Sequence, residues 1–371
     1  MPAHRRLPLA LVAATAALLL PAPHRAEAVG FEIRGAGWGH GVGMSQWGAR
    51  GYAKHGREHE RILEHYYRHT RVGQTERRKV SVLLRSGPGA VRFSGASGAC
   101  GSNLDESREY RADRGGPDVL LRTAGGEQLE NCGRELQARG RESIRVEGKG
   151  TYRGDLVVRA RSGGGLEAIN AVNLEAYVQG VVPNEMPSDW PAEALRAQAV
   201  AARSYALATS VRGEGFDHYD DTRSQVYGGR SSETGATNAA VARTDGQVVR
   251  HGKEVATTYF FSSSGGRTES SEYGFVGGES RPYLRSVDDP YDRASPYHRW
   301  KVAYTRDEIQ NRLGGLVEGR LRSIEVTERG RSPRIVRARV RGSGGSTAVN
   351  GLTLQSRLDL RSTWARFKKR G

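Results

Sequence analysis

The sequence of 371 residues contains only two cysteines, Cys100 and Cys132. Two thiolates cannot complete a tetrahedral structural zinc site without other ligands, so a zinc-stabilised fold is not expected from them alone. Long apolar runs are also missing beyond the first residues. The run from Leu7 to Leu20 is shorter than the roughly twenty residues that span a bilayer. The composition therefore excludes a membrane protein with several spans.

The first residues have the features of an export signal. Arg5 and Arg6 precede the apolar run, and Ala26-Glu27-Ala28 is a small-x-small cleavage site. We predict that residues 1–28 form a signal peptide that is cleaved. The mature protein is then secreted to the extracytoplasmic space or cell wall, without a transmembrane segment. A retained N-terminal anchor is the alternative.

Acidic residues are in deficit. Asp and Glu number 41 against 57 Lys and Arg, which gives a net charge of +16 and a pI near 10.1. Such a charge predicts attraction to anionic polymers. The arginines are scattered and no nucleic-acid-binding module is recognisable, so we expect no nucleic-acid partner. For an exported chain we interpret the charge as retention at the wall, not as catalysis.

In an oxidising compartment, two cysteines are most simply explained as one disulfide. We predict that Cys100 and Cys132 are bridged, and two free thiols are the alternative. The surrounding residues 79–170 contain short alternating runs separated by Gly, Asp and Pro, such as KVSVLLRSG and SIRVEG. This pattern is typical of sheets with one solvated face.

The most informative stretch is residues 170–208. Glu185 lies between Pro183 and Pro187, so we predict that it occupies a stiff loop after an alternating apolar segment. Ser188 or Asp189 is predicted to cap a long helix that follows. That helix has a small-residue surface suited to close packing, formed by Ala194, Ala197, Ala201 and Ala202.

Taken alone, Glu185 could equally be a surface glutamate that caps a helix. The whole stretch VNLEAYVQGVVPNEMPSDWPAEALRAQAVAARSYAL, however, resembles the SpoIID/LytB family (stage II sporulation protein D-like proteins). The resemblance implies that Glu185, just before Met186 and Pro187, is the catalytic acid of a lytic transglycosylase that cleaves peptidoglycan glycan strands. Other members of the family enhance cell-wall amidases. The resemblance leaves both functions open.

A second family block, GHGVGMSQWGA, lies within the Gly-rich residues 35–56. In most members this block follows the Glu-Met-Pro block, whereas here it comes first. The order resembles a circular permutation, which proteins tolerate when their termini lie close together. We therefore expect the C-terminal strand that ends near Phe367 to lie beside the strand near Phe31.

The resemblance, together with the polar side chains of its blocks, indicates a set of substrate-binding candidates. They are His40, Ser45 and Gln46 in the Gly-rich block, Gln198 and Arg203 on the helix, Gln225 and Tyr227 after it, and Ser262, Ser263 and Gly265 in the block TTYFFSSSGGRTESSEY. Trp47 is predicted to add an aromatic face for sugar, and Arg203 to meet a substrate carboxylate. Glu185 remains the catalytic candidate.

Family members often carry two cysteines and a histidine for zinc in the segment that corresponds to residues 216–229. Here the cysteine positions hold Tyr219 and Ser224. His218 and the two aspartates beside it could imitate a metal site, but such clusters are usually solvated turns. We expect neither a metal nor another cofactor.

We therefore predict an α+β fold: a β-rich, single SpoIID-like domain of residues 29–371, with two lobes and a central helix after the catalytic loop. Residues 29–78 form the Gly-rich groove block, 79–170 a β-rich lobe, and 171–371 the catalytic lobe. Within the last range, residues 306–367 are interpreted as completing its core.

Two functions follow from these observations. The first is an exported lytic transglycosylase that acts on peptidoglycan, with Glu185 as general acid and base. The second is a non-catalytic glycan-binding enhancer of a cell-wall amidase, which needs the groove but not the acid. A basic structural protein of the wall would explain the charge but none of the family blocks.

The segment around His218 yields a test. Because the cysteine positions hold Tyr219 and Ser224, protein purified without added metal should contain no stoichiometric zinc by elemental analysis, and chelator treatment should leave its unfolding temperature unchanged. One zinc ion per chain would contradict this interpretation.

Overall fold

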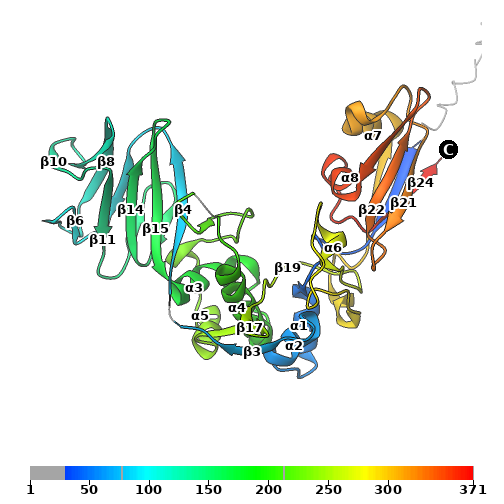
Figure 1. The fold of residues 1–371 in the computed structure, drawn as a ribbon, viewed down its shortest axis with the longest axis horizontal. Helices are drawn as coiled ribbons and strands as arrows, with labels where there is room; N and C mark the ends of the chain where they lie inside the picture. The colour runs from blue at the N-terminus through cyan, green and yellow to red at the C-terminus, as the bar shows by residue number, and fades with distance from the viewer. Residues whose placement is uncertain (1–29, 77, 212–213, 371) are drawn as a thin grey trace, which may run out of the picture.

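The computed structural model of the chain describes residues 30–76, 78–211 and 214–370. The predicted signal peptide, residues 1–28, lies outside them. Figure 1 shows a β-rich region at one end, a mainly helical middle and a C-terminal unit at the other end. The predicted α+β class, rich in strands, is confirmed. In the described part of the chain, no helix has the length and apolar character needed to cross a membrane.

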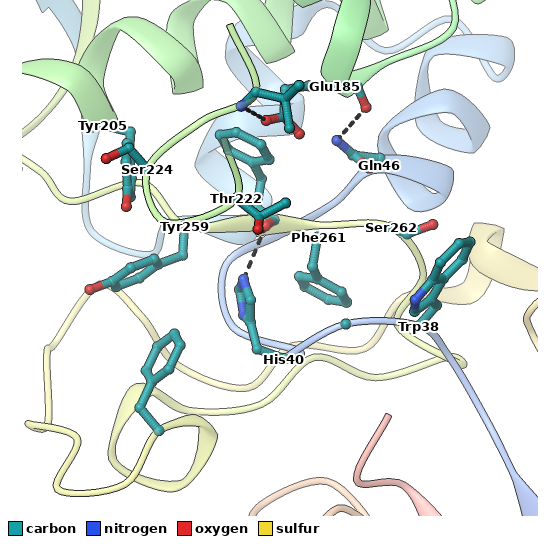
Figure 2. A pocket seen from close by; sticks show the side chains of 14 residues that line it. Trp38, His40, Gln46, Glu185, Tyr205, Thr222, Ser224, Tyr259, Phe261 and Ser262 are labelled. Carbon is teal, nitrogen blue, oxygen red and sulfur yellow. Dashed lines mark hydrogen bonds between the residues drawn. The ribbon is translucent and has the colours of Figure 1, made fainter. Parts of the chain in front are cut away.

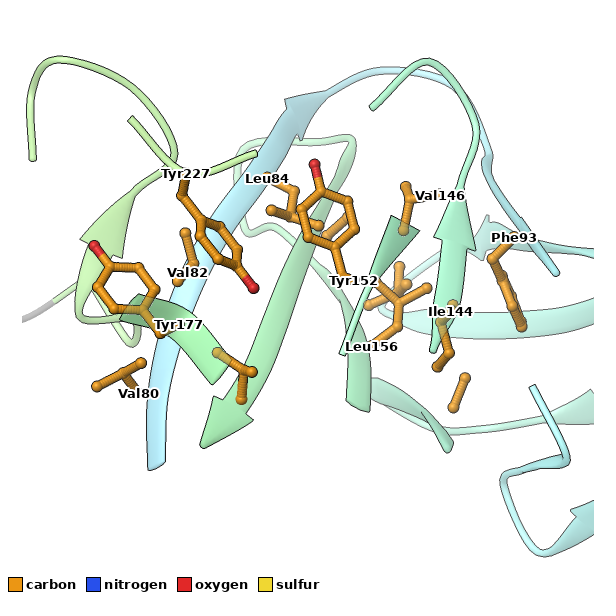
Figure 3. Packing of buried hydrophobic residues seen from close by; sticks show 14 of the residues in the cluster. Val80, Val82, Leu84, Phe93, Ile144, Val146, Tyr152, Leu156, Tyr177 and Tyr227 are labelled. Carbon is orange, nitrogen blue, oxygen red and sulfur yellow. The ribbon is translucent and has the colours of Figure 1, made fainter. Parts of the chain in front are cut away.

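The β-rich region consists of two sheets with the strand orders β10-β9-β8-β5-β12-β13 and β16-β4-β15-β14-β11-β6-β7, where the edge strand β16 (His218–Tyr219) comes from a later part of the chain. Its strands are β4 (Lys79–Gly87), β5 (Val91–Ser94), β6 (Gly98–Ala99), β7 (Ser102–Asn103), β8 (Glu109–Gly115), β9 (Asp118–Thr123), β10 (Gln128–Asn131), β11 (Glu135–Arg139), β12 (Ile144–Val146), β13 (Gly150–Tyr152), β14 (Asp155–Ala160) and β15 (Leu166–Asn173). Alternate residues point inward, as Leu136 and Ala138 do on β11. Figure 3 shows how Phe93 and Leu156 pack in this core.

A disulfide joins Cys100, in the turn between β6 and β7, to Cys132, just after β10. The two Cα atoms are 5.4 Å apart and the cysteines are 32 positions apart in sequence. It links the edges of the two sheets. Closing a loop of this size contributes about 3–4 kcal/mol to stability by the chain-entropy estimate.

The middle of the molecule is built around helix α4 (Figure 1). Its helices are α1 (Gln46–Lys54), α2 (His59–Tyr66), α3 (Leu174–Glu185), α4 (Ala192–Ala208), α5 (Gly235–Arg243) and α6 (Ser271–Gly274), with the 3₁₀ turns η1 (Gly229–Ser232) and η2 (Pro290–Ala294). Its short strands are β2 (Met44–Ser45), β3 (Arg71–Gln74), β16 (His218–Tyr219), β17 (Gln247–His251), β18 (Glu254–Val255) and β19 (Phe260–Phe261).

The prediction that Glu185 lies in a loop was wrong, because residues 174–185 form helix α3. The side chain of Asn173 caps this helix by accepting a hydrogen bond from the Glu175 N–H at 2.9 Å. Pro183 lies in the last turn, where its missing N–H removes one intrahelical bond shortly before the helix ends. Met186 is extended, as a residue before proline should be. Glu185 is therefore the last helical residue.

The start of α4 also differs from the prediction. Its N-cap is Pro191, whose carbonyl accepts from the N–H groups of Ala194 and Leu195 at 2.9 and 3.2 Å. Neither Ser188 nor Asp189 caps the helix, because both lie in the turn that precedes Pro191. The predicted small-residue surface is confirmed: Ala194, Ala197, Ala201 and Ala202 are all fully buried. Small side chains let α1, α2, α3 and α5 approach α4 closely.

The C-terminal unit has a hydrophobic core of its own. Its elements are β1 (Gly30–Gly35), β20 (Trp300–Thr305), α7 (Arg306–Leu313), η3 (Gly314–Leu316), β21 (Ser323–Arg329), β22 (Ile335–Arg341), β23 (Ser346–Asn350), α8 (Gly351–Arg357) and β24 (Ala365–Arg370). The strands form the sheets β20-β1-β24 and β21-β22-β23. The sequence analysis interpreted residues 306–367 as completing the core of the catalytic lobe. Their apolar side chains pack with Phe31 and Ile33 of β1 instead.

The expected pairing between the two ends of the domain is confirmed. Strand β1 pairs antiparallel with β24, with Ile33 opposite Phe367 and Gly30 opposite Arg370. The blue strand within the otherwise orange and red unit of Figure 1 shows this pairing. The circular permutation itself stays a prediction.

The antiparallel register suggests a direct test of the permutation. Joining residue 370 to residue 30 through a short Gly-containing turn should create a β-hairpin, and new termini can be opened before Lys79. We expect this rearranged chain to fold, with the near-UV circular dichroism of the original and a cooperative unfolding transition. A chain opened inside β15 is the control and should not fold. A rearranged chain that remains unfolded would contradict the prediction.

Candidate active site

A cavity of about 580 Å³ lies where the end of α3 meets the Gly-rich segment before α1. Figure 2 shows its side chains. It is lined by Trp38, Gly39, His40, Gln46, Glu185, Tyr205, Thr222, Ser224, Val226, Tyr259, Phe260, Phe261, Ser262 and Phe275. Seven of these fourteen residues carry aromatic rings, counting the imidazole of His40. Glu185 is its one acidic residue, and no lysine or arginine is among these described residues.

Glu185 is partly buried at the edge of the cavity. One carboxyl oxygen, Oε1, accepts a hydrogen bond from the Val226 N–H at 2.9 Å (Figure 2). Burial raises the pKa of the Glu185 carboxyl above its ordinary value, and the Val226 hydrogen bond opposes that rise. Desolvation disfavours the charged form, so this carboxyl retains its proton at a higher pH than an exposed glutamate does.

Gln46 fixes the end of α3 at the edge of the cavity. Its side-chain Nε2 donates to the backbone carbonyl of Glu185 at 2.8 Å and lies 3.4 Å from Oε1 of Gln198. A C-terminal helix carbonyl has no intrahelical partner, and Gln46 supplies one. The first residue of α1 therefore positions the backbone that carries the carboxylic acid.

His40 lines the cavity opposite Glu185 but is not available as a base. Its Nδ1 accepts from the Val42 N–H at 3.1 Å, so Nε2 carries the proton and donates to the Phe260 carbonyl at 3.1 Å. Burial lowers the pKa of His40 to about 4, with the Phe260 carbonyl opposing and the charge of Arg334 adding to the shift. The neutral ring instead forms part of the aromatic lining, 5.2 Å from Phe275 between centroids.

The glycines of this segment allow the backbone to run close to strand β19. Gly39 and Gly43 have φ values of 103° and 78°, in the region that favours glycine. A Cβ atom at Gly39 would lie 2.9 Å from Cβ of Phe261, and one at Gly43 would collide with the Tyr259 carbonyl. Close approach is what brings His40 and Gln46 to the same cavity as Glu185.

The structure contradicts the prediction that Arg203 binds substrate. Its side chain is fully buried and forms two hydrogen bonds with the Glu175 carboxylate, at 2.7 and 2.6 Å. It also donates to the Gln247 carbonyl at 3.0 Å. Arg203 thus ties α4 to the start of α3 and to β17. Such a bidentate pair leaves no donor directed at the cavity.

Three other candidates bind an aspartate that the sequence analysis missed. Ser45 Oγ and Ser263 Oγ donate to the buried carboxylate of Asp292 at 3.2 and 2.9 Å, and the Gly265 N–H donates to it at 2.9 Å. These groups are therefore not available to a sugar, contrary to the prediction. Of the predicted serines, only Ser262 lines the cavity. No local signal marks Asp292, since its partners come from distant segments.

Three more candidates lie behind the cavity and do not line it. Gln198 is fully buried beside Gln46. Gln225 is 1% exposed and accepts from the Tyr177 hydroxyl at 3.2 Å, while Tyr227 donates to Oδ1 of Asn170 at 2.7 Å. The structure therefore contradicts direct substrate contact for these residues. Burial is the reason, because their polar groups are directed into the protein.

The tryptophan that lines the cavity is Trp38, not the predicted Trp47. Trp38 is 42% exposed at one end of the cavity, whereas Trp47 packs against Trp190 at 4.9 Å between ring centroids. Both lie in the Gly-rich block. The position of Trp38 between two glycines could have indicated its exposure, because neighbours without side chains cannot cover the indole ring.

The segment around His218 is held by contacts within the protein. His218 Nε2 lies 3.1 Å from the Ala206 carbonyl, while Asp220 pairs with Lys149 at 2.7 Å. The Tyr219 N–H donates to Ser224 Oγ at 3.1 Å, so the two positions at which the resemblance implies cysteines lie side by side. Within the described residues, no group of three or more metal-ligating side chains occurs. The expectation about metal stays a prediction.

The part of the chain that contains Glu185 is similar to known proteins. Residues 162–251, which include Glu185, match the sequence model of the family described as SpoIID: Stage II sporulation protein. The chain is 30% identical over 222 residues to stage II sporulation protein D of Bacillus subtilis. The aligned segment covers 55% of this chain and 63% of that protein. It is 38% identical over 135 residues to the amidase enhancer of Bacillus subtilis. That segment covers 36% of this chain and 18% of that protein.

A further relative is an uncharacterised protein of Brachyspira hyodysenteriae, 37% identical over 164 residues that cover 43% of this chain and 42% of that protein. The chain thus matches less than two thirds of the length of each of these relatives.

The raised pKa of Glu185 leads to a prediction about stability. As pH rises above the ordinary glutamate pKa of about 4.3, the unfolded chain loses this proton first, so the native protein loses stability until the raised pKa is passed. Glu185→Gln cannot ionise and should keep one hydrogen bond from Val226. We expect its unfolding temperature to equal that of wild type near pH 4 and to exceed it at pH 8.

Thermal unfolding measured from pH 4 to pH 8 checks this expectation. The control is Glu254→Gln, which alters an exposed glutamate in the same way and should change little at any pH. A Glu185→Gln protein that is less stable than wild type by the same margin at both pH values would show that burial does not disfavour the Glu185 carboxylate.

Proposed function

We propose that the chain acts on the cell wall, because residues 162–251 match the SpoIID family model and the chain is similar to stage II sporulation protein D and to an amidase enhancer. We further propose that it is a peptidoglycan lytic transglycosylase that cleaves glycan strands, with Glu185 as general acid and then general base. The observation that carries this proposal is a lone, partly buried carboxyl group in an aromatic-lined cavity.

The number of carboxylates supports this class of reaction over ordinary glycoside hydrolysis. Hydrolases of the common types use two carboxyl groups about 5–10 Å apart, one as acid and the other as nucleophile or base. Among the described lining residues, Glu185 has no such carboxylate partner. A lytic transglycosylase can act with one, because a hydroxyl of the muramoyl residue itself displaces the leaving sugar.

In the first step, the protonated Glu185 carboxyl donates its proton to the glycosidic oxygen as the bond between that oxygen and the anomeric carbon breaks. The raised pKa keeps this proton in place at a higher pH than on an exposed glutamate. In the second step, the Glu185 carboxylate accepts the proton of the muramoyl hydroxyl, whose oxygen bonds to the anomeric carbon and closes an anhydro ring. The Val226 N–H holds Oε1 throughout.

The remaining lining suits a sugar chain. Trp38, Tyr259 and Phe275 present aromatic surfaces, while Gln46 and Ser262 add polar groups at the edges. Flat apolar ring faces beside a few polar groups are typical of ligand cavities that fix orientation. A positive charge next to Glu185 would lower the pKa of its carboxyl group, and the neutral His40 adds no such charge.

The second candidate function is a non-catalytic glycan-binding enhancer of a cell-wall amidase. It is supported by the 38% identity to the amidase enhancer, whose matched segment covers 36% of this chain. Such a protein uses the same cavity to hold glycan and needs no proton transfer from Glu185. Its partners are peptidoglycan strands and an amidase. In either case we propose an extracytoplasmic site of action, on the strength of the predicted signal in residues 1–28.

The substitution Glu185→Gln separates the two functions. Gln has the same shape but cannot donate a proton, so cleavage of purified peptidoglycan should fall at least about a hundredfold while glycan binding persists. Mass spectrometry should detect anhydromuramoyl ends after digestion by wild type, and the wild-type rate should fall on the alkaline side as the carboxyl ionises. Glu254→Gln is the matched control and should retain full activity.

Two results would redirect the proposal. Cleavage by Glu185→Gln at the wild-type rate would remove Glu185 from the mechanism. No cleavage by either protein, together with stimulation of an added amidase by both, would establish the enhancer function instead.

A further inference from the structure

The positive charge of the chain is concentrated near its C-terminal end. Residues 300–371 contain 17 Lys and Arg against six Asp and Glu, a net charge of +11 out of +16. Residues 30–299 contain 37 against 34, a net charge of only +3. The charge is therefore not scattered evenly, as the sequence analysis assumed. Attraction to anions should be strongest at the C-terminal unit.

The pairing register gathers basic residues of β20, β1 and β24 on one face. Arg34 of β1 lies between Lys301 of β20 and Arg366 of β24. Two residues along β1, Glu32 lies opposite Lys368. We call this surface the basic face, and its cations are Arg34, Lys301, Arg366, Lys368 and Arg370.

The basic face points away from the core of the unit. The alternate residues of β1, Phe31 and Ile33, are 2% and 0% exposed within that core. By contrast, the side chains of Arg34, Lys301 and Arg370 are 69%, 54% and 53% exposed. In Figure 1 this sheet belongs to the end of the molecule opposite the β-rich region. It is accessible to a large partner.

One carboxylate lies beneath these cations. Glu32 is 1% exposed and pairs with Arg34 at 2.6 Å, with Lys301 at 3.3 Å and with Arg370. Within the described part of the chain, Arg366 and Lys368 have no carboxylate partner. Five cations over one carboxylate give the basic face a net charge of +4.

This arrangement opposes the stability of the protein without a ligand. Like charges directly opposite on neighbouring strands are destabilising, and Arg34 has such a neighbour on each side. The repulsion reaches beyond the sheet, because burial and then the charge of Arg366 lower the pKa of Arg329. An anion on the basic face would relieve this repulsion, which points to a binding role.

We propose that the basic face binds a linear phosphodiester polymer whose phosphates are separated by polyol or sugar units. The site is separate from the cavity around Glu185 and would hold the protein on an anionic polymer while the cavity acts on glycan. This inference does not depend on whether Glu185 is catalytic.

The composition of the basic face favours such a polymer over a lipid bilayer or nucleic acid. Elements that lie on membranes insert aromatic or long apolar side chains, and single-strand binders stack bases on aromatic rings. Ala303 is the one apolar residue among the outward-facing positions that the register gives to these strands. Recognition is therefore purely electrostatic.

The spacing of the cations suits a flexible chain of phosphates. Neighbouring strands are about 4.8 Å apart, and residues on one face of a strand repeat about every 6.7 Å. One phosphate can therefore contact two cations in a row such as Arg34 and Arg366. The next phosphate can reach the following row, where Lys368 lies.

The test compares two doubly substituted proteins with the same loss of charge. Arg366→Gln/Lys368→Gln removes the two unpaired cations of the basic face. Arg108→Gln/Arg145→Gln removes two exposed arginines of the β-rich region and is the control. Binding of fluorescent poly(glycerol phosphate) is measured at several salt concentrations, beside phosphatidylglycerol vesicles and a single-stranded oligonucleotide.

We expect wild type, the control and Glu185→Gln to bind the polymer equally. The Arg366→Gln/Lys368→Gln protein should bind roughly tenfold or more weakly at low salt, with the slope of log K against log salt smaller by about 2. Its unfolding temperature should stay near that of wild type, because Arg366→Gln relieves repulsion with Arg34 while Lys368→Gln removes an attraction to Glu32. Loss of binding can then not be assigned to misfolding.

Several results would overturn the proposal. One is equal binding of the polymer by both doubly substituted proteins. Another is tight binding to vesicles without binding to the polymer, which would indicate a membrane surface. The third is a much higher affinity for the oligonucleotide than for the polymer, which would indicate nucleic acid.

Discussion

The buried carboxylate of Asp292 is the contact on which the cavity most depends. It accepts hydrogen bonds from Ser45 Oγ at the start of α1, from the backbone N–H groups of residues 264 and 265, and from Ser263 Oγ, and His298 Nδ1 lies 2.9 Å away. These groups come from three separate segments. One fully buried carboxylate therefore fixes the Gly-rich block against strand β19 and so shapes the cavity opposite Glu185. Removing it would leave several buried donors unpaired, which is costly in a low-dielectric interior.

A second carboxylate beside it behaves differently. Asp289 accepts from the Tyr66 hydroxyl at 2.9 Å, and burial followed by the charge of Asp292 raises the pKa of Asp289 to about 7. Glu185 is also shifted upward by burial, but it has access to the cavity. Among the described residues, the carboxyl groups with a raised pKa are thus Glu185 and Asp289, and of these two only Glu185 lines the cavity and suits proton transfer to a substrate. Perturbation alone does not identify a catalytic group.

Strand β1 connects the two activities that we propose. Its far end leads directly into the Gly-rich segment that lines the cavity, while its outer face carries Arg34 between two other cations. The same strand lies between β20 and β24, so it is held on both edges. A polymer bound on the basic face would therefore be linked through a rigid element to the segment that carries Trp38 and His40.

The sequence by itself determined the fold class, the buried alanine surface of α4 and the pairing of the terminal strands, and it singled out Glu185 as the catalytic candidate. These follow from local composition, periodicity and a long family motif, which are properties of neighbouring residues. It did not determine that Arg203, Ser45 and Ser263 serve the interior, because their partners Glu175 and Asp292 lie far away in the chain. Nor did it locate the basic face, which exists only because strand register places cations from residues 34, 301 and 366 side by side. Burial and register depend on which distant segments meet, and tertiary structure alone decides that.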